Sequence, residues 1–297
     1  MVGLRIADKR IRIEMPEKFL HDNFYIFLDE DENDSWDFFW CVKYKDEYSE
    51  AYDRLEGGSS SELRRLIVSP DNETIIYEFY EDNAIPERIV ATNRCKEALF
   101  LLDERYRNPD QDDLERIKVC LFNTFREVFF LGLGYMGIYT VHSASVIADN
   151  KAYLFSTFSG GGKSTHSNMW IENFDADTLN GDVAVLNIDE KGYLYAYGLP
   201  WCGTSGLFVN KKAVVGGIAF IEQEKYNEIE QIYKDDAALS LYFNCFTPML
   251  TEELVDNMID FVHKAINKTS VYRLKCLPNI DAAKLSYGKM TQKGLDG

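Results

Sequence analysis

The pattern of hydrophobic and polar residues divides the chain into two parts. Up to about residue 100, short aromatic and β-branched runs alternate with acidic or Gly/Ser turns, which is typical of a small sheet. The segment 57–61, Gly-Gly-Ser-Ser-Ser, predicts an exposed loop within this part. The runs that predict strands are residues 10–14, 24–28, 36–44, 65–68, 74–80 and 88–92.

A helix is predicted next, at residues 112–131, and we expect it to join the two parts of the chain. Its apolar side chains recur at helical spacing and would share one face. They are Leu114, Ile117, Leu121, Phe122, Phe125 and Phe129.

Beyond Gly134 the pattern predicts a second sheet accompanied by helices. Apolar runs at 139–147 and 152–156 flank Asp149-Asn150, a typical tight-turn pair, and therefore predict a β-hairpin. Strands are also expected at 183–188, 193–197 and 214–222, and helices at 235–246 and 252–267. The second of these helices would have Thr251 as its N-cap, and its inward residues would be Leu254, Met258, Phe261, Val262 and Ile266.

These elements predict an α/β (α+β) chain of two domains. The first, residues 1–135, would be a smaller β-rich domain with the connecting helix, serving substrate recognition or assembly. The second, residues 136–297, would hold a mixed sheet and the chemistry described below.

Composition narrows the classes of partner. Hydrophobic residues make up 46% of the chain, as expected of a packed globular protein. The formal charge of −17 repels polyanions, which argues against nucleic acid or an anionic membrane as a partner. A phosphate-bearing ligand would therefore need a local cationic pocket.

The six cysteines and the apolar segments bear on location. The cysteines show no close-spaced pairs of the metal or redox kind, so we expect reduced thiols and a cytoplasmic protein. The N-terminal segment shows no signal-peptide pattern. The most apolar window, residues 128–139, contains three glycines and is shorter than the roughly 20 residues of a membrane span. It predicts a buried helix end and loop.

A glycine-rich segment follows the strand predicted at 152–156 and leads into a candidate helix. Glycines let successive N–H groups converge on phosphate oxygens, a lysine reaches the outer phosphates, and a serine hydroxyl can bind Mg²⁺. The segment therefore predicts binding of ATP and Mg²⁺. Its candidate binding residues are Ser159, Gly160, Gly161, Gly162, Lys163, Ser164 and Thr165.

An antiparallel neighbour directly before the loop strand is unusual for P-loop ATPases, whose sheets are largely parallel. Together with Ser159-Gly160-x-Gly162-Lys163-Ser164, it resembles the HPr kinase/phosphorylase family, whose loop reads Gly-x-Ser-Gly-x-Gly-Lys-Ser, and the related ATP-dependent phosphoenolpyruvate carboxykinases. The resemblance covers about residues 138–225. The chain departs from the common pattern at Thr157, where glycine is expected, and a β-branched residue there could weaken ATP binding or reshape the loop.

A carboxylate follows about one helix and one turn later. Asp182 resembles the metal-binding acidic motif of that superfamily, in which two adjacent aspartates stand, but here Val183 follows it. The resemblance implies that Ser164 and Asp182 hold Mg²⁺. Asp175 and Asp177 could supply the missing carboxylate, or could be ordinary solvated loop residues.

Two further features lie near this motif. His142 stands at a distance before the loop similar to that of a histidine in HPr kinases, and it could face the phosphates or be satisfied within its strand. The segment 198–206 resembles a Pro-Trp-x-Gly loop of HPr-kinase-like proteins. Its residues Thr204 and Ser205, with the following Lys211 and Lys212, could hold substrate or phosphate, or form an ordinary exposed loop.

The resemblance implies an ATP-dependent phosphotransferase that moves the γ-phosphoryl group to a hydroxyl, with a serine of a peptide or protein preferred to a small hydroxylated molecule. Lys163 would neutralise the phosphates, and Asp182 or His142 would assist the acceptor. A homo-oligomer is compatible with the family. The alternatives are a catalytically silent nucleotide-binding regulator, favoured by Thr157 and Val183, and a structural protein in which the glycine-rich segment binds no nucleotide.

Overall fold

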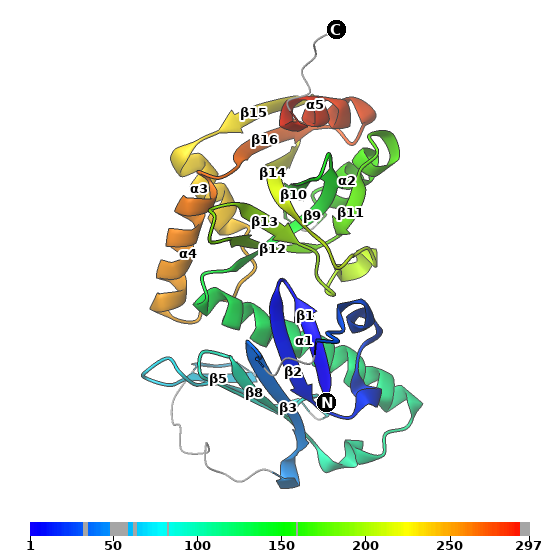
Figure 1. Ribbon diagram of the computed structural model, residues 1–297, viewed down its shortest axis with the longest axis vertical. Helices are drawn as coiled ribbons and strands as arrows, with labels where there is room; N and C mark the ends of the chain where they lie inside the picture. Colours follow the sequence, from blue (N-terminus) through cyan, green and yellow to red (C-terminus); the bar gives the residue numbers. More distant parts are fainter. Residues whose placement is uncertain (32–34, 48–58, 62–63, 82, 159, 292–297) are drawn as a thin grey trace. The chain divides into compact units, whose positions relative to one another are not determined.

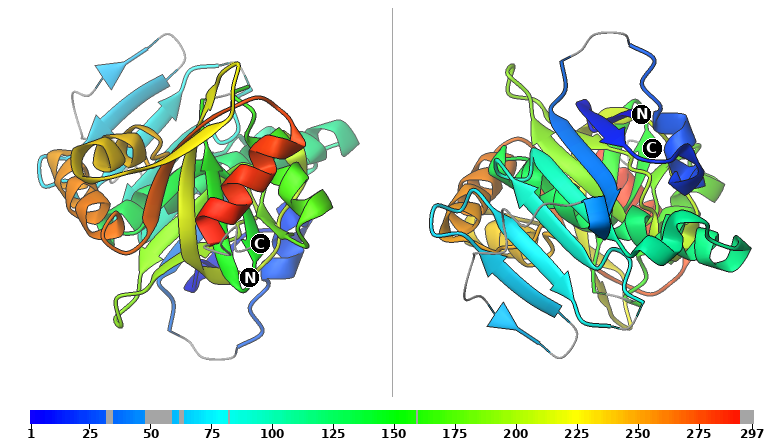
Figure 2. Two further views of the ribbon diagram at one scale, coloured as in Figure 1. Left: turned by 90° about the horizontal axis from the view of Figure 1, so that it is seen from above. Right: turned by 90° about the horizontal axis from the view of Figure 1, so that it is seen from below.

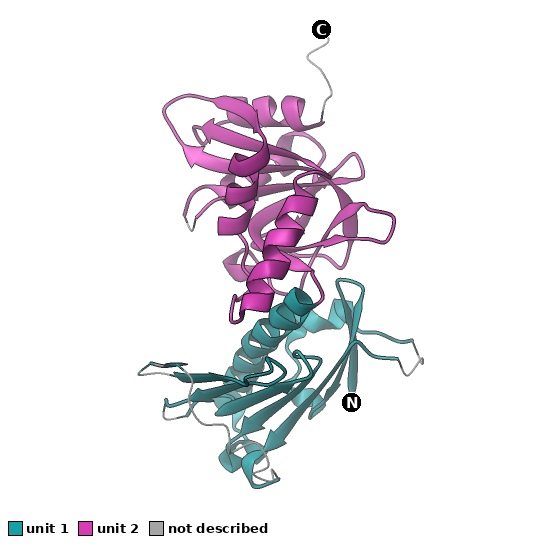
Figure 3. Cartoon of the chain, turned by 90° about the vertical axis from the view of Figure 1, so that its left-hand side faces the viewer, with its two compact units in different colours: residues 1–135 teal, residues 136–297 magenta. Residues whose placement is uncertain are grey.

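The computed structural model describes residues 1–31, 35–47, 59–61, 64–81, 83–158 and 160–291. The chain forms two compact units, Met1–Tyr135 and Met136–Gly297 (Figure 3). Each unit contains a sheet with both parallel and antiparallel strand pairs, and helices accompany the sheets. The predicted mixed α/β class is therefore confirmed at this level.

The sheet of unit 1 runs in the order β1-β2-β3-β8-β7-β6-β5-β4 within the described residues (Figure 1). Five of the six predicted runs are strands, and the predicted loop at 57–61 lies partly outside the described residues and partly in β4. The strand bounds are β1 (Val2–Ile6), β2 (Lys9–Glu14), β3 (Phe38–Tyr44), β4 (Ser59–Ser60), β5 (Arg64–Val68), β6 (Ile75–Phe79), β7 (Arg88–Thr92) and β8 (Glu97–Leu102).

Helix α1 (Gln111–Tyr135) packs its apolar face on this sheet. The Phe125 ring lies 5.6 Å from that of Trp40 on β3 and 4.7 Å from that of Phe100 on β8, measured between centroids. Near the helix end, a Cβ at Gly132 would come within 2.4 Å of the Phe38 ring, so only glycine allows this close approach. The predicted helix and its buried glycine-containing end are confirmed.

The predicted strand at 24–28 is wrong, because residues Asp22–Phe27 form the 3₁₀ helix η2. The His21 side chain caps it by accepting a hydrogen bond from Asn23 N. Phe24 and Phe27 are both buried, and their spacing of three residues matches the three residues per turn of a 3₁₀ helix. The other 3₁₀ segments described in unit 1 are η1 (Glu17–Phe19), η3 (Lys45–Glu47) and η4 (Glu104–Arg107).

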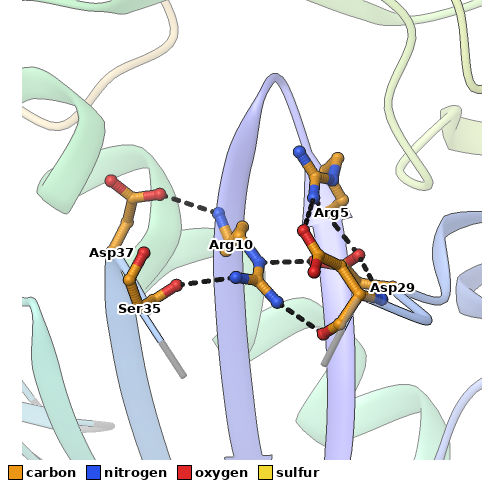
Figure 4. A network of polar contacts seen from close by, with 6 residues as sticks. Arg5, Arg10, Asp29, Ser35 and Asp37 are labelled. Carbon is orange, nitrogen blue, oxygen red and sulfur yellow. Dashed lines mark hydrogen bonds and ion pairs between the residues drawn. The ribbon is translucent and has the colours of Figure 1, made fainter. Parts of the chain in front are cut away.

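Arg10 ties β2 to two neighbouring segments through a buried polar network (Figure 4). Its side chain is 8% exposed and donates from Nε to Asp29 Oδ2 at 2.7 Å. The remaining guanidinium nitrogens donate to the backbone oxygens of Ser35 and Asp31. The Arg10 guanidinium thus has both an ionic partner and carbonyl acceptors, and these contacts offset the free-energy cost of removing its charge from water.

The sheet of unit 2 runs β10-β9-β12-β13-β14-β16-β15 within the described residues, with β11 beside β9. A further parallel pairing of β10 with β14 closes a circuit of five strands. The bounds are β9 (Tyr139–Ala148), β10 (Lys151–Ser156), β11 (Asp177–Asn180), β12 (Val183–Ile188), β13 (Leu194–Tyr197), β14 (Lys212–Gln223), β15 (Glu228–Ile232) and β16 (Ser270–Cys276). The predicted hairpin is confirmed, and Asp149 and Asn150 both have positive φ, as a type I′ turn requires.

Helices flank this sheet on both faces (Figures 1 and 2). One core joins the sheet to α2 (Lys163–Asn173) and α5 (Ile280–Thr291) around Trp170 and Met290. The other joins it to α3 (Lys234–Phe243) and α4 (Glu252–Ala265) around Leu241 and Phe261. Thr251 caps α4 by accepting from Leu254 N, as predicted. None of the described helices combines the length and apolar character needed to cross a membrane.

Candidate functional site

The glycine-rich segment forms the turn from β10 into α2. β10 ends at Ser156 and α2 begins at Lys163, with Gly162 at the N-cap position. Gly160 and Gly162 have φ of 79° and 102°, a backbone conformation that glycine adopts without strain. Among the described residues no side chain caps α2, so the N–H groups of its first turn are available to an anion. Ser159, predicted as a binding residue, lies outside the described residues.

Thr157 is accommodated without a left-handed backbone, because it is not among the described residues with positive φ. Its side chain is buried and packs against Gly161, where an added Cβ would lie 2.4 Å from Thr157 Oγ1 and 2.5 Å from Cγ2. Thr157 therefore does not need the left-handed backbone geometry that β-branched residues tolerate poorly, and its effect on ATP binding stays a prediction. The absence of a side chain at Gly161 provides the space that the threonine fills.

The Lys163 side chain is fixed by a hydrogen bond to the backbone of the loop. Its Nζ donates to the carbonyl oxygen of Thr157 at 3.2 Å, and the residue is 8% exposed. Burial lowers the pKa of the Lys163 ammonium, while the nearby Asp182 carboxylate acts to raise it. The lysine thus lies within electrostatic reach of the carboxylate predicted to act with it.

Asp182 lies in the turn between β11 and β12, and Asn180 shapes that turn. Asn180 Oδ1 accepts from the N–H groups of Asp182 and Val183 at 2.9 and 3.0 Å. Its Nδ2 donates to the carbonyl oxygens of Leu199 and Trp201 at 2.9 and 3.1 Å. This fully buried amide therefore fastens the Asp182 turn to the predicted Pro-Trp loop.

His142 on β9 faces the same carboxylate. Its Nε2 lies 3.6 Å from Asp182 Oδ1, and the two side chains are 29% and 35% exposed. Burial and then the charge of Lys163 lower the pKa of His142, against an opposing effect of Asp182. A lowered pKa favours the neutral imidazole, which can accept a proton at neutral pH.

These side chains line one pocket of about 510 Å³, which we call the phosphate pocket. Among the predicted residues that the structure describes, those that line this pocket are His142, Gly160, Gly162, Lys163, Ser164, Thr165, Asp182, Thr204 and Ser205. Gly161 lines an adjoining pocket of about 420 Å³ instead, and Gly162 and Thr165 line both. The structure thus gathers the loop, the carboxylate and the histidine around one space.

Other predicted residues lie elsewhere. Asp175 and Asp177 do not line the phosphate pocket, so neither supplies a second carboxylate there, and the position after Asp182 is the buried Val183. Lys212 lies over the rings of Tyr195 and Tyr197, and neither it nor Lys211 lines the pocket.

The chemistry of the donors fits Mg²⁺ bound together with a nucleotide. No group of three His, Cys, Asp or Glu side chains in the described part of the chain could hold a metal by itself. Ser164 and Asp182 nevertheless provide two hard oxygen donors on one pocket, and Mg²⁺ is commonly held by one or two protein oxygens plus substrate phosphates and water.

Sequence reasoning missed two residues that organise the site, Asn180 and Gly203. A Cβ at Gly203 would lie 2.7 Å from the Asp182 carboxyl carbon, so the Pro-Trp loop presents bare backbone to that carboxylate. The dipeptide Asn180-Gly181 is a turn signal that could have drawn attention to Asn180. Gly203 is the glycine of the Pro-Trp-x-Gly resemblance, but nothing local in the sequence indicates that it approaches Asp182.

Comparison with known proteins gives a distant structural neighbour. No family model matches the chain, and neither does any curated protein. Among solved structures, the HPr(Ser) kinase/phosphatase from Coxiella burnetii matches with 15% sequence identity and a TM-score of 0.30, over 52% of this chain and 99% of the neighbour. At this identity and TM-score the likeness establishes neither activity nor family membership.

Proposed function

We propose that the protein is an ATP-dependent kinase that transfers the γ-phosphoryl group to a hydroxyl, with a serine of a peptide or protein as the preferred acceptor. The supporting observation is that Lys163, Ser164, Asp182 and His142 all line the phosphate pocket at the end of β10. A cationic group, hydroxyl and carboxylate oxygens and a proton acceptor around one phosphate-binding turn are the parts that phosphoryl transfer requires.

The phosphates would bind at the start of α2. The positive φ values of Gly160 and Gly162 bring the loop backbone around this end of the helix, and the uncapped N–H groups supply hydrogen-bond donors. Lys163 would release the Thr157 carbonyl oxygen and neutralise the outer phosphates. Local positive potential would thus offset the negative charge of the whole chain.

The apolar pocket adjoining the loop would hold the nucleotide base. It shares Gly162 and Thr165 with the phosphate pocket and continues over Met169, Ile221 and Leu277. A flat aromatic base prefers such an environment, whereas the triphosphate prefers the glycine-rich turn.

Ser164 and Asp182 would hold Mg²⁺ against the phosphates. When bound, the ion neutralises charge that develops on the transferred group. Asn180 orients Asp182 through the two backbone bonds that fix its turn.

His142 and Asp182 would position and deprotonate the acceptor. Their facing atoms are 3.6 Å apart, so one hydroxyl oxygen can lie within hydrogen-bond distance of both. As the acceptor oxygen bonds to the γ-phosphorus, the bond from phosphorus to the β,γ-bridging oxygen breaks and its electrons leave with ADP. The hydroxyl proton passes to His142 Nε2, whose lowered pKa keeps the imidazole neutral and ready to accept it.

A second candidate is a nucleotide-binding regulator without catalysis. It is favoured by Val183, whose burial in the sheet leaves Asp182 without the neighbouring carboxylate of the HPr kinase motif. A small hydroxylated molecule also remains an alternative acceptor. All three candidates require ATP to bind at the same loop.

Calorimetric titration with ATP and Mg²⁺ tests the shared requirement. The Lys163→Ala variant should weaken ATP binding by about ten- to hundredfold, since a charge-assisted hydrogen bond is lost. Lys284→Ala is the matched control, because that side chain is 64% exposed on α5 and lies outside the phosphate pocket. Binding should survive there.

Phosphoryl transfer to a serine-containing peptide library, followed with the same proteins, separates the candidates. Transfer by the wild type supports the kinase, and ATP binding with neither hydrolysis nor transfer supports the regulator. Absence of ATP binding in the wild type would refute all three candidates.

A further inference from the structure

A second pocket of about 480 Å³ lies on the other side of His142. It is lined by the start of the loop, the end of β14, the last turn of α3 and the segment that follows this helix, including Phe158, Phe243 and Phe246. We call it the aromatic pocket. Neither the phosphate pocket nor the proposed base pocket contains these three phenylalanines.

The wall of the aromatic pocket is fixed by hydrogen bonds where β10 leaves the sheet. His142 N donates to Asn244 O at 3.0 Å, and Phe246 N donates to Thr140 O at 2.8 Å, so residues 244–246 run along β9. Ser156 Oγ lies 2.6 Å from His142 O and 3.0 Å from Asn244 Oδ1. The pocket is thus a built feature and not an open gap beside a helix.

The rim of this pocket exposes an unusual amount of aromatic surface. Phe243 is 76% exposed, Phe158 is 72% exposed and Phe246 is 43% exposed. Large apolar side chains gathered around a concave site indicate a ligand that covers them, because such exposure is otherwise unfavourable.

His142 forms a wall common to the aromatic pocket and the phosphate pocket. Its ring lies 5.9 Å from that of Phe246, edge to face, while its Nε2 faces Asp182. A hydroxyl held between His142 and Asp182 would therefore have the rest of its molecule within reach of the aromatic pocket.

We infer that the aromatic pocket is the acceptor site, and that it selects a hydroxyl borne beside a large apolar group, as in a serine next to an aromatic residue. This inference rests on the proposed phosphoryl transfer. Among the described residues, the lining of this pocket includes the carboxylate of Glu222, which pairs with Arg273 at 3.1 Å, and no lysine or arginine that could pair with an acidic neighbour of the acceptor. An acceptor with acidic neighbours would therefore be disfavoured.

NMR without ATP tests the inference, with ligand signals giving the affinities and the histidine-ring signals of the protein giving the location, so its outcome is separate from that of the nucleotide titration. The probes are N-acetyl-Ser-Phe-amide, N-acetyl-Ser-Ala-amide and 2-phenylethanol. The phenylalanine peptide should bind at least about tenfold more tightly than the alanine peptide, because an aromatic side chain is buried. It should also shift the His142 ring resonance but not that of His263, which is exposed on α4.

Phe243→Ala should remove that preference, whereas Leu239→Ala should retain it. Leu239 is a matched control because it is 54% exposed on the same helix and does not line the aromatic pocket. Equal affinity for the two peptides, an unchanged preference in Phe243→Ala, or no response of His142 would overturn the inference. Binding of 2-phenylethanol equal to that of the phenylalanine peptide and dependent on Phe243 would support the site and assign it to a small aromatic alcohol.

Discussion

Thr157 and Gly161 form a pair within the phosphate loop. The common loop pattern has glycine where this chain has Thr157, and the threonine side chain occupies the space that a side chain at Gly161 would need. The run of three glycines in this chain therefore has a steric explanation. Gly160 and Gly162 provide positive φ, and Gly161 provides room for Thr157.

Gly161→Ala should destabilise the protein by about 1 to 3 kcal/mol, as expected of overpacking, and should weaken ATP binding. The double variant Thr157→Gly with Gly161→Ala should recover most of this loss, less the roughly 1 kcal/mol that an added glycine costs in chain entropy. Thermal unfolding of the two single variants and the double variant measures the coupling. Additive effects would show that the two side chains do not compete for one space.

His142 should titrate below its ordinary pKa of 6.5, because burial and Lys163 both oppose its positive form. Asp182→Asn should lower the pKa further, since the carboxylate is the group that favours the imidazolium. NMR titration of the histidine ring protons measures both values. Asp175→Asn, which removes a carboxylate outside the phosphate pocket, serves as the control. A rise of the His142 pKa in Asp182→Asn would contradict the proposed geometry.

At the scale of elements, the turn between β11 and β12 depends on Asn180. Its amide uses both ends, accepting from two N–H groups and donating to two carbonyl oxygens. Asn180→Asp would keep the acceptor oxygen but lose the donors to Leu199 and Trp201. It would also bury a carboxylate that solvent does not reach, because position 180 is fully buried.

We expect Asn180→Asp to lower the free energy of unfolding by about 1 to 3 kcal/mol, as for a buried group left without its partner. Phosphoryl transfer should fall by more than ATP affinity does, because Asp182 would be displaced while the loop at α2 stays in place. Denaturant unfolding and single-turnover assays measure these two effects. Asn168→Asp, on an exposed position of α2, is the control for adding a carboxylate near the site. An equal loss in both variants would assign the effect to charge alone.

Local patterns were sufficient for elements with a strong apolar period. Helix α4 was predicted by its stripe and by Thr251, whose capping bond is present. β1, β4, β8, β11, β15, β16 and α5 were not predicted. β11 has only four residues, and α5 is held by long-range bonds from His166 and Trp170 to Ser286, which local periodicity does not reveal. The run at 24–28 is aromatic and β-branched, which is typical of a strand. The only sign of a 3₁₀ helix is the three-residue spacing of the buried Phe24 and Phe27, and one such interval is too short to establish a period.

The candidate site could be predicted in its chemistry but not in its arrangement. Lys163 and Ser164 follow from the loop pattern, and Asp182 from its spacing after the loop. Their meeting with His142 depends on strand register, since His142 is opposite Val183 across β9 and β12. The roles of these residues remain predictions. The aromatic pocket depends on residues 244–246 lying beside β9, a long-range pairing that the sequence pattern does not contain.

At the scale of the whole chain, stability is divided between two units with their own polar and apolar interiors. Unit 2 has cores on both faces of its sheet, whereas unit 1 combines aromatic packing under α1 with the buried Arg10 network (Figure 4). Asp29 is the central carboxylate of this network and its side chain is 5% exposed. Low pH should therefore destabilise unit 1 by protonating the buried Asp29. This effect is separate from the change in net charge that acid causes in the whole acidic chain.

Burial acts to raise the pKa of Asp29, but the hydrogen bond from Arg10, the Asp31 N–H and the charge of Arg5 together hold that pKa below its ordinary value of 3.8. A depressed pKa in the folded state stabilises the protein above the unfolded pKa, and this contribution disappears as the pH falls through the folded value. Asp29→Asn should thus cost on the order of 2 kcal/mol at pH 7 and flatten the stability profile of unit 1 as the pH falls below the ordinary Asp pKa of 3.8.

Hydrogen exchange of the full-length protein, followed in β2 and β3 between pH 7 and the start of acid unfolding, measures this effect within unit 1. Asp8→Asn is a suitable control, since Asp8 lies in the tight turn between β1 and β2 with positive φ, a conformation that asparagine also adopts. If Asp29→Asn and Asp8→Asn lost protection equally, the acid sensitivity would come from net charge. A loss confined to Asp29→Asn would show that one buried ion pair sets the acid limit of the unit.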